Sequence, residues 1–115
     1  MEHQAFLEQH LRHSKAVDTS DIDWEAVPRH PLRDDEIQVL SYFMDVESNT
    51  IIYLKELLST PAAHDPQIQA FLSCWAYEEF FHGHAIKRFL QAYGVPVDEA
   101  RTVINAEKKP FWAHL

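Results

Sequence analysis

Three ionisable residues have the types and the spacing needed to hold a metal ion. Glu79 and His82 lie three positions apart, so on a helix both side chains project from one face. Glu47 lies upstream, in the middle of another helix-like pattern. Two carboxylates with one imidazole suit a hard or borderline cation such as Fe²⁺ or Mn²⁺. The sequence therefore predicts a metal site with Glu47, Glu79 and His82 as ligands.

These three residues occupy positions that would otherwise be apolar. In each of two segments, apolar residues recur every three or four positions, the spacing of one buried helical face. Glu47 takes one place in the first row, and Glu79 and His82 take two places in the second. The apolar members of the rows are Ile37, Leu40, Met44, Ile51, Leu54 and Leu58, then Ile68, Leu72, Trp75, Ile86, Phe89 and Tyr93. A buried carboxylate is costly unless it is paired, so each ionisable residue needs a hydrogen bond, a counter-charge or a metal.

Two long helices are expected to position these side chains. The first should run from Asp34 to Ser59, opening with three acidic residues that suit the positive end of the helix dipole. The second should begin after the capping residue Asp65 and end at Tyr93, before Gly94. The short connection predicts an all-α fold built on an antiparallel long-helix hairpin. The middles of its helices, and with them the three ligands, would then lie at the same level.

The remaining segments are expected to be less regular. A weak amphipathic helix should run from about Gln4 to Val17, followed by an irregular arm up to Arg33. A short helix should follow Pro96, from Val97 or Asp98 to Lys109. We therefore divide a single domain into residues 1–33, the N-terminal helix and arm, and residues 34–115, the hairpin with the short C-terminal helix.

Composition excludes several classes of protein. A formal net charge of −8 disfavours both nucleic acid and anionic membrane surfaces as partners. The single cysteine, Cys74, excludes an internal disulfide framework. No stretch has the roughly 20 apolar residues that a transmembrane helix needs. The N-terminus also lacks the apolar core of a signal peptide, so we expect a cytoplasmic protein.

Glu78 and the basic residues leave two alternatives open. Glu78 lies off the apolar row, where it is either a surface charge or the group that holds the His82 ring in one tautomer. The three candidate ligands could also be paired without any metal. The basic residues available for such pairing are Arg12, Arg33, Lys87 and Arg88.

The segment around the second pair of ligands resembles a known family. Residues 75–83 read WAYEEFFHG, which is similar to the Trp-x-x-Glu-Glu-x-x-His-Gly segment of soluble acyl-carrier-protein desaturases, members of the ferritin-like superfamily. Glu47 resembles the lone glutamate that this family places on the preceding helix. The likeness covers roughly residues 34–94. It implies a di-iron cluster that activates O₂, with Glu79 bridging the metals and with Glu47 and His82 as terminal ligands.

The sequence also departs from that family. The second Glu and Glu-x-x-His pair of the family is absent, Phe80 and Phe81 replace a polar pair inside the motif, and the net charge is ill suited to an acidic acyl carrier protein. The chain thus supplies half of a carboxylate-bridged di-metal site. A two-fold homodimer would supply four glutamates and two histidines and would complete a four-helix bundle. The alternative is that this sequence is the N-terminal part of a longer bundle.

Three functions follow as hypotheses. The first is a di-iron oxidoreductase, in which Mn could replace Fe, acting on O₂ and an unidentified small-molecule or acyl substrate. The second is an iron-binding protein for storage or sensing, without turnover. The third is a metal-free helical interaction module.

Overall fold

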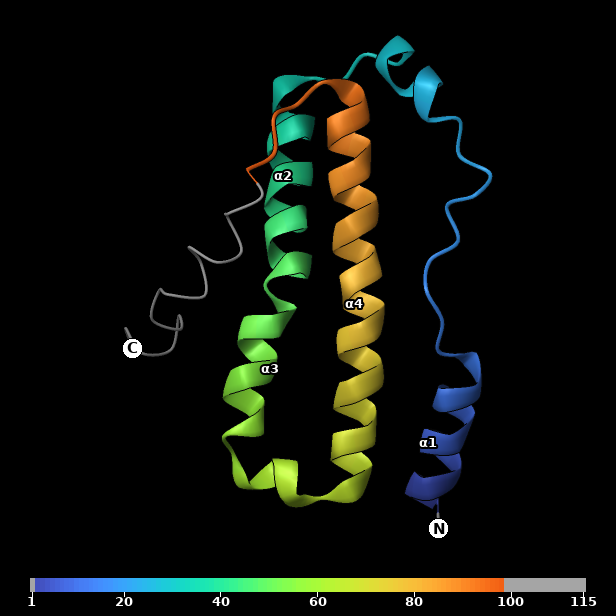
Figure 1. Ribbon diagram of the computed structural model, residues 1–115, viewed down its shortest axis with the longest axis vertical. Coiled ribbons are helices and arrows are strands. Elements are labelled where there is room, and N and C mark those ends of the chain that lie inside the picture. The colour runs from blue at the N-terminus through green and yellow to red at the C-terminus, as the bar shows by residue number, and fades with distance from the viewer. Residues whose placement is uncertain (1, 99–115) are drawn as a thin grey trace.

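The computed structural model describes residues 2–98 (Figure 1). Within that range every regular element is a helix, which confirms the all-α prediction. Two helices carry the predicted ligands, α2 (Asp34–Ser48) and α4 (Pro66–Tyr93), and α3 (Thr50–Leu58) follows α2 in the chain. The chain reverses direction after α3 through the 3₁₀ helix η2 (Pro61–His64), and α4 then runs back alongside α3 and α2 (Figure 1).

Helix α4 begins and ends where its capping residues predict. The Asp65 carboxylate accepts hydrogen bonds from the backbone N–H groups of Gln67 (2.8 Å) and Ile68 (3.4 Å). These groups have no partner within the first turn of a helix, so the cap satisfies them. At the other end Gly94 has a φ of 100°, a left-handed conformation that favours glycine, and its N–H bonds back to the last turn. The predicted bounds of this helix are confirmed.

The prediction of one continuous helix from Asp34 to Ser59 is wrong. The helix is interrupted at Asn49, which separates α2 from α3. Ser48, Asn49 and Thr50 form a run of short polar residues, whose side chains compete for backbone hydrogen bonds. The Thr50 hydroxyl donates to the Glu47 carbonyl at 2.8 Å, and therefore satisfies a backbone group at the interruption.

The N-terminal helix is shorter than predicted, and the arm that follows it is more ordered than predicted. Helix α1 runs over Glu2–His13, against a predicted end at Val17, and packs against α4 (Figure 1). The arm contains a 3₁₀ helix, η1 (Trp24–Arg29), in which the Asp23 carboxylate accepts from the Ala26 N–H at 3.3 Å. The predicted helix from Val97 or Asp98 to Lys109 lies almost entirely outside the described residues.

The interface between α2 and α4 lies slightly to one side of the predicted rows. On α4 the buried residues are Leu72, Gly83 and Leu90, while His82 sits at the edge of the interface. On α2 Met44 is buried as predicted, but Ile51 and Leu58, which lie beyond the interruption on α3, are exposed. Within residues 2–98, no helix is long and apolar enough to cross a bilayer.

Candidate metal centre

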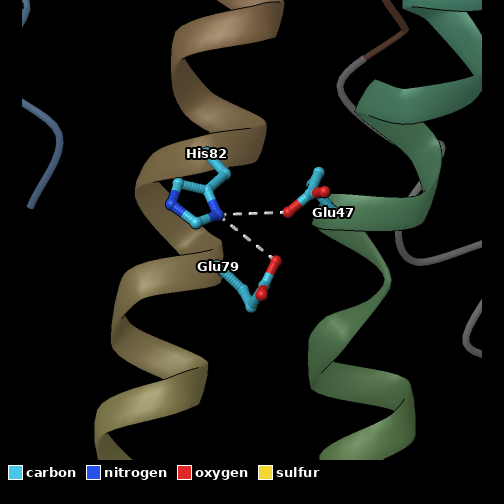
Figure 2. A group of neighbouring side chains, drawn as sticks. All are labelled: Glu47, Glu79 and His82. Carbon is cyan, nitrogen blue, oxygen red and sulfur yellow. Dashed lines mark ion pairs between the residues drawn. The ribbon is translucent and has the colours of Figure 1, made fainter. Parts of the chain in front are cut away.

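The structure brings Glu47, Glu79 and His82 together across the α2–α4 interface (Figure 2). Nδ1 of His82 lies 3.3 Å from Oε2 of Glu47 and 3.5 Å from Oε2 of Glu79. One ligand atom from each residue can be chosen so that all three lie within 4.8 Å of one another. Figure 2 shows both carboxylates directed at the same ring nitrogen, so the three donors converge on one small volume.

The side chains of this centre differ in their exposure. About a quarter or less of each glutamate side chain is exposed, against 42% for His82. Oε2 of Glu47 is fully buried and makes no hydrogen bond, although His82 lies close to it. A buried carboxylate oxygen without a hydrogen bond is costly, and a bound cation would remove that cost.

The two carboxylates also perturb each other. Hydrogen bonding with the Glu79 carboxyl raises the pKa of Glu47, burial and the negative charge of Glu79 raise it further, and His82 opposes the shift. Like charges this close favour a protonated carboxyl when no cation is present. A metal ion would compete with that proton for the same carboxylate.

Gly83 lets the two helices approach at the level of the centre. A Cβ atom at position 83 would lie 2.8 Å from Oγ of Ser48 and 3.2 Å from the Ser48 backbone nitrogen. Such distances leave no room for a side chain, so α2 touches the backbone of α4 here. Sequence reasoning gave this glycine no role. Its signal was an isolated glycine inside a helical pattern, which often marks a close packing contact.

Glu78 lies outside the group of three. Its Oε1 is 3.5 Å from Nε2 of His10, on α1. The His10 ring also lies 5.6 Å from the ring of Phe71, centroid to centroid. Glu78 therefore helps to hold α1 against α4, a role that its position in the sequence did not indicate.

Three of the four basic residues that could have neutralised the centre have partners elsewhere. Arg12 pairs with Glu8, Arg33 with Asp35 and Glu36, and the Arg88 guanidinium lies over the Trp24 ring at 4.3 Å. Among the described ion pairs, Glu47 and Glu79 each pair with the His82 imidazole. The three arginines are therefore engaged away from the centre.

The donor set fits a divalent metal. Ligand nitrogen and oxygen atoms lie about 2.0–2.2 Å from ions such as zinc, so small rotations of these side chains would close the group around one ion. Two carboxylates and one imidazole occupy one side of such an ion. The remaining coordination positions would then be open to water, a small substrate or donors from another chain.

Comparison with known proteins assigns this chain to no group. No protein-family model matches it, and neither a curated protein nor a solved structure does.

Proposed function

We propose that this protein binds iron or manganese through Glu47, Glu79 and His82. The observation that carries the proposal is the convergence of their three donor atoms from two helices, with a buried Glu47 oxygen that lacks a hydrogen bond. The three donors are two carboxylates and one imidazole, with no thiolate. Such a set binds harder metals such as iron and manganese in preference to soft ones.

We further propose that two copies of the chain complete the centre. Each copy contributes one Glu and one Glu-x-x-His, half of the set found in carboxylate-bridged di-metal bundles. The exposed part of His82 lies at the edge of the α2–α4 interface, where a second copy could reach it. The assembly would be a ferritin-like four-helix bundle with the metals near the two-fold axis.

The activity proposed for the completed centre is O₂-activating oxidoreduction. Bound ferrous iron would supply electrons to O₂. Glu47 and Glu79 would hold the metal and stabilise its higher charge, and His82 would complete the donor set. The packed helices on one side of the group would limit the access of water to it. The organic substrate, a small molecule or an acyl group, is proposed from the family resemblance.

An anaerobic Fe²⁺ titration tests metal binding. Saturation at one iron per chain is expected, because each chain provides one group of three donors. Glu79→Gln should lose about 2–4 kcal/mol of binding free energy, since a neutral amide replaces a charged ligand. The matched control is Glu78→Gln, which changes the adjacent glutamate in the same way and should retain binding.

Two results would overturn the metal proposal. One is the absence of saturable binding by the wild-type chain, which would favour the metal-free pairing seen between His82 and the two carboxylates. The other is equal loss in both glutamine variants. Where iron binds, continued O₂ consumption with a reductant indicates an enzyme, whereas consumption that stops when the added iron is oxidised indicates storage or sensing.

A further inference from the structure

A pocket of about 400 Å³ lies beside the interruption between α2 and α3. Ser48 and Thr50 line it from either side of the interruption, and Ala76 and Gly83 line it from α4. The small side chain of Ala76 leaves space between the helices that a larger side chain would fill. The volume lies in the range of small-molecule sites, roughly 300–1,000 Å³.

The pocket opens on a different side of α4 from the metal ligand His82. Ala76, Phe80 and Gly83 line the pocket and are spaced four and three apart, so they form one row along the helix. His82 directly precedes Gly83 and is therefore rotated by about 100° from this row. A second copy that reaches the exposed part of His82 would leave the pocket accessible.

The apolar walls of the pocket favour a flat ligand. The rings of Phe80 and His84 are stacked, with centroids 5.9 Å apart and an angle of 10° between their planes. Phe80 and Ile51, which also lines the pocket, are among the most exposed large apolar side chains of the described residues, at 62% and 58%. A planar ring placed against these side chains would remove apolar area from water and stack on an aromatic face.

The charged side chains in the pocket wall are already engaged. The carboxylate of Glu47 is directed toward His82, whose Nδ1 lies 3.3 Å from Oε2 of Glu47 (Figure 2). Lys87, the basic residue of the wall, also has an interaction within the chain. An anion or a cation placed here would lose hydration without gaining a free counter-charge from either residue, and that loss is costly.

We propose that this pocket binds an uncharged, planar aromatic molecule. Its ring would lie against Phe80 and Ile51, with the small residue Ala76 leaving the space that it occupies. The engaged charges of Glu47 and Lys87 disfavour ligands of either sign. This binding does not depend on a metal, although Glu47 borders both the pocket and the metal centre.

Three naphthalene derivatives of nearly the same shape test the charge of the ligand. Naphthalene-2-carboxamide is neutral, naphthalene-2-carboxylate is an anion, and naphthalene-2-carboxamidine is a cation. Each is equilibrated with the full chain by dialysis in EDTA, at about pH 8, where histidine is ordinarily neutral. An ionic strength of about 0.15 M screens charges that lie beyond roughly 8 Å. We expect one carboxamide to bind per chain, with an affinity about tenfold higher than that of either charged derivative.

Two pairs of variants test the location of the ligand. Ala76→Leu should weaken carboxamide binding about tenfold by filling the pocket, whereas Ala62→Leu, at an exposed position in η2, should leave it unchanged. Phe80→Ala should weaken binding to a similar extent by removing the stacking ring, and its exposed position makes a loss of folding unexpected. Tyr77→Ala is the matched control for Phe80→Ala, because Tyr77 is a second exposed aromatic residue of α4 outside the pocket wall.

Four results would overturn the proposal. Carboxamide binding that does not saturate would indicate a diffuse apolar surface. A carboxylate or carboxamidine that binds as tightly as the carboxamide would show that Lys87 or Glu47 supplies a counter-charge after all. Equal effects of the pocket and control variants would place the ligand elsewhere. Affinity that falls as the protein concentration rises would show that a second copy covers this face.

The metal proposal and the pocket proposal can fail separately. Glu79 is a metal ligand that does not line the pocket. Glu79→Gln should therefore retain carboxamide binding while it loses iron, and Phe80→Ala should retain iron while it loses the carboxamide. Loss of both ligands in either variant would show that the two sites are not independent.

Discussion

Glu47 lies in surroundings that an ordinary helical surface glutamate does not meet. One of its oxygens is buried without a hydrogen bond, and a second carboxylate lies beside it. Its pKa is raised by hydrogen bonding with Glu79, by burial and by the charge of Glu79. The native protein therefore binds a proton at this residue more tightly than the unfolded chain does.

This shift predicts how the metal-free protein responds to pH. Between the ordinary glutamate pKa of 4.5 and the raised value, the folded state holds more protons than the unfolded state. The contribution of Glu47 to stability is present below this window and is lost as pH rises through it. Melting temperatures in EDTA should thus fall with rising pH for the wild type relative to Glu47→Gln. Parallel curves for the two proteins would contradict the prediction.

Metal binding should have the opposite pH dependence. Glu47 must lose its proton to act as a ligand, so affinity for Fe²⁺ or Mn²⁺ should increase as pH rises through its raised pKa. Anaerobic titrations at several pH values measure this directly. An affinity independent of pH across that window would remove Glu47 from the ligand set.

At the scale of elements, the contact between α2 and α4 at Gly83 sets the distance between the ligands. Gly83→Ala should separate the helices beside Ser48 and weaken metal binding. Overpacking typically costs about 1–3 kcal/mol, and the better helix propensity of alanine offsets about 1 kcal/mol of that. We therefore expect the loss of iron-binding free energy to exceed the loss in the free energy of unfolding. A variant that binds iron normally would show that the close approach is not needed.

At the interruption, the hydroxyl of the buried Thr50 satisfies the Glu47 carbonyl. Thr50→Val removes the hydrogen bond to the Glu47 carbonyl but keeps the shape of the side chain, and should cost about 1–2 kcal/mol. Thr60 provides the matched control, because its hydroxyl donates to the Leu57 carbonyl at 2.7 Å at an exposed position. Thermal denaturation should show a clear loss for Thr50→Val and a smaller one for Thr60→Val. Equal losses would mean that burial at the interruption is unimportant.

At the scale of the whole molecule, the described chain is open rather than compact. Its radius of gyration is 17.0 Å, against about 13 Å for a compact domain of this length. Its buried apolar residues are few, whereas large apolar side chains remain exposed along α2, α3 and α4. A chain with this much exposed apolar surface is expected to bury part of it against another surface.

The proposed dimer makes a prediction about two adjacent aromatic residues. Val39 and Phe43 precede Glu47 at intervals of four, so all three share one side of α2, and both apolar side chains are exposed. Phe43→Glu should weaken dimerisation about hundredfold, since a charge would be buried in the interface. Tyr42→Glu changes the neighbouring residue, which lies about 100° around the helix and whose ring meets that of Phe43 edge-on at 5.8 Å between centroids, and should weaken the dimer much less. Sedimentation equilibrium distinguishes them, and a wild-type chain that stays monomeric with metal bound would overturn the dimer.

The sequence by itself determined the helical class, both ends of α4 and the three residues that converge. These depend on local properties, namely the capping residues, the period of apolar residues and the spacing of Glu79 and His82. The interruption at Asn49 has a local origin in Ser48, Asn49 and Thr50, but the apolar spacing that continues through these residues did not predict it. Only the tertiary structure decided the contact at Gly83 and the pairing of Glu78 with His10, because each joins segments that are distant in the sequence. For the same reason the buried row of α4 lies beside the predicted one and leaves His82 at its edge.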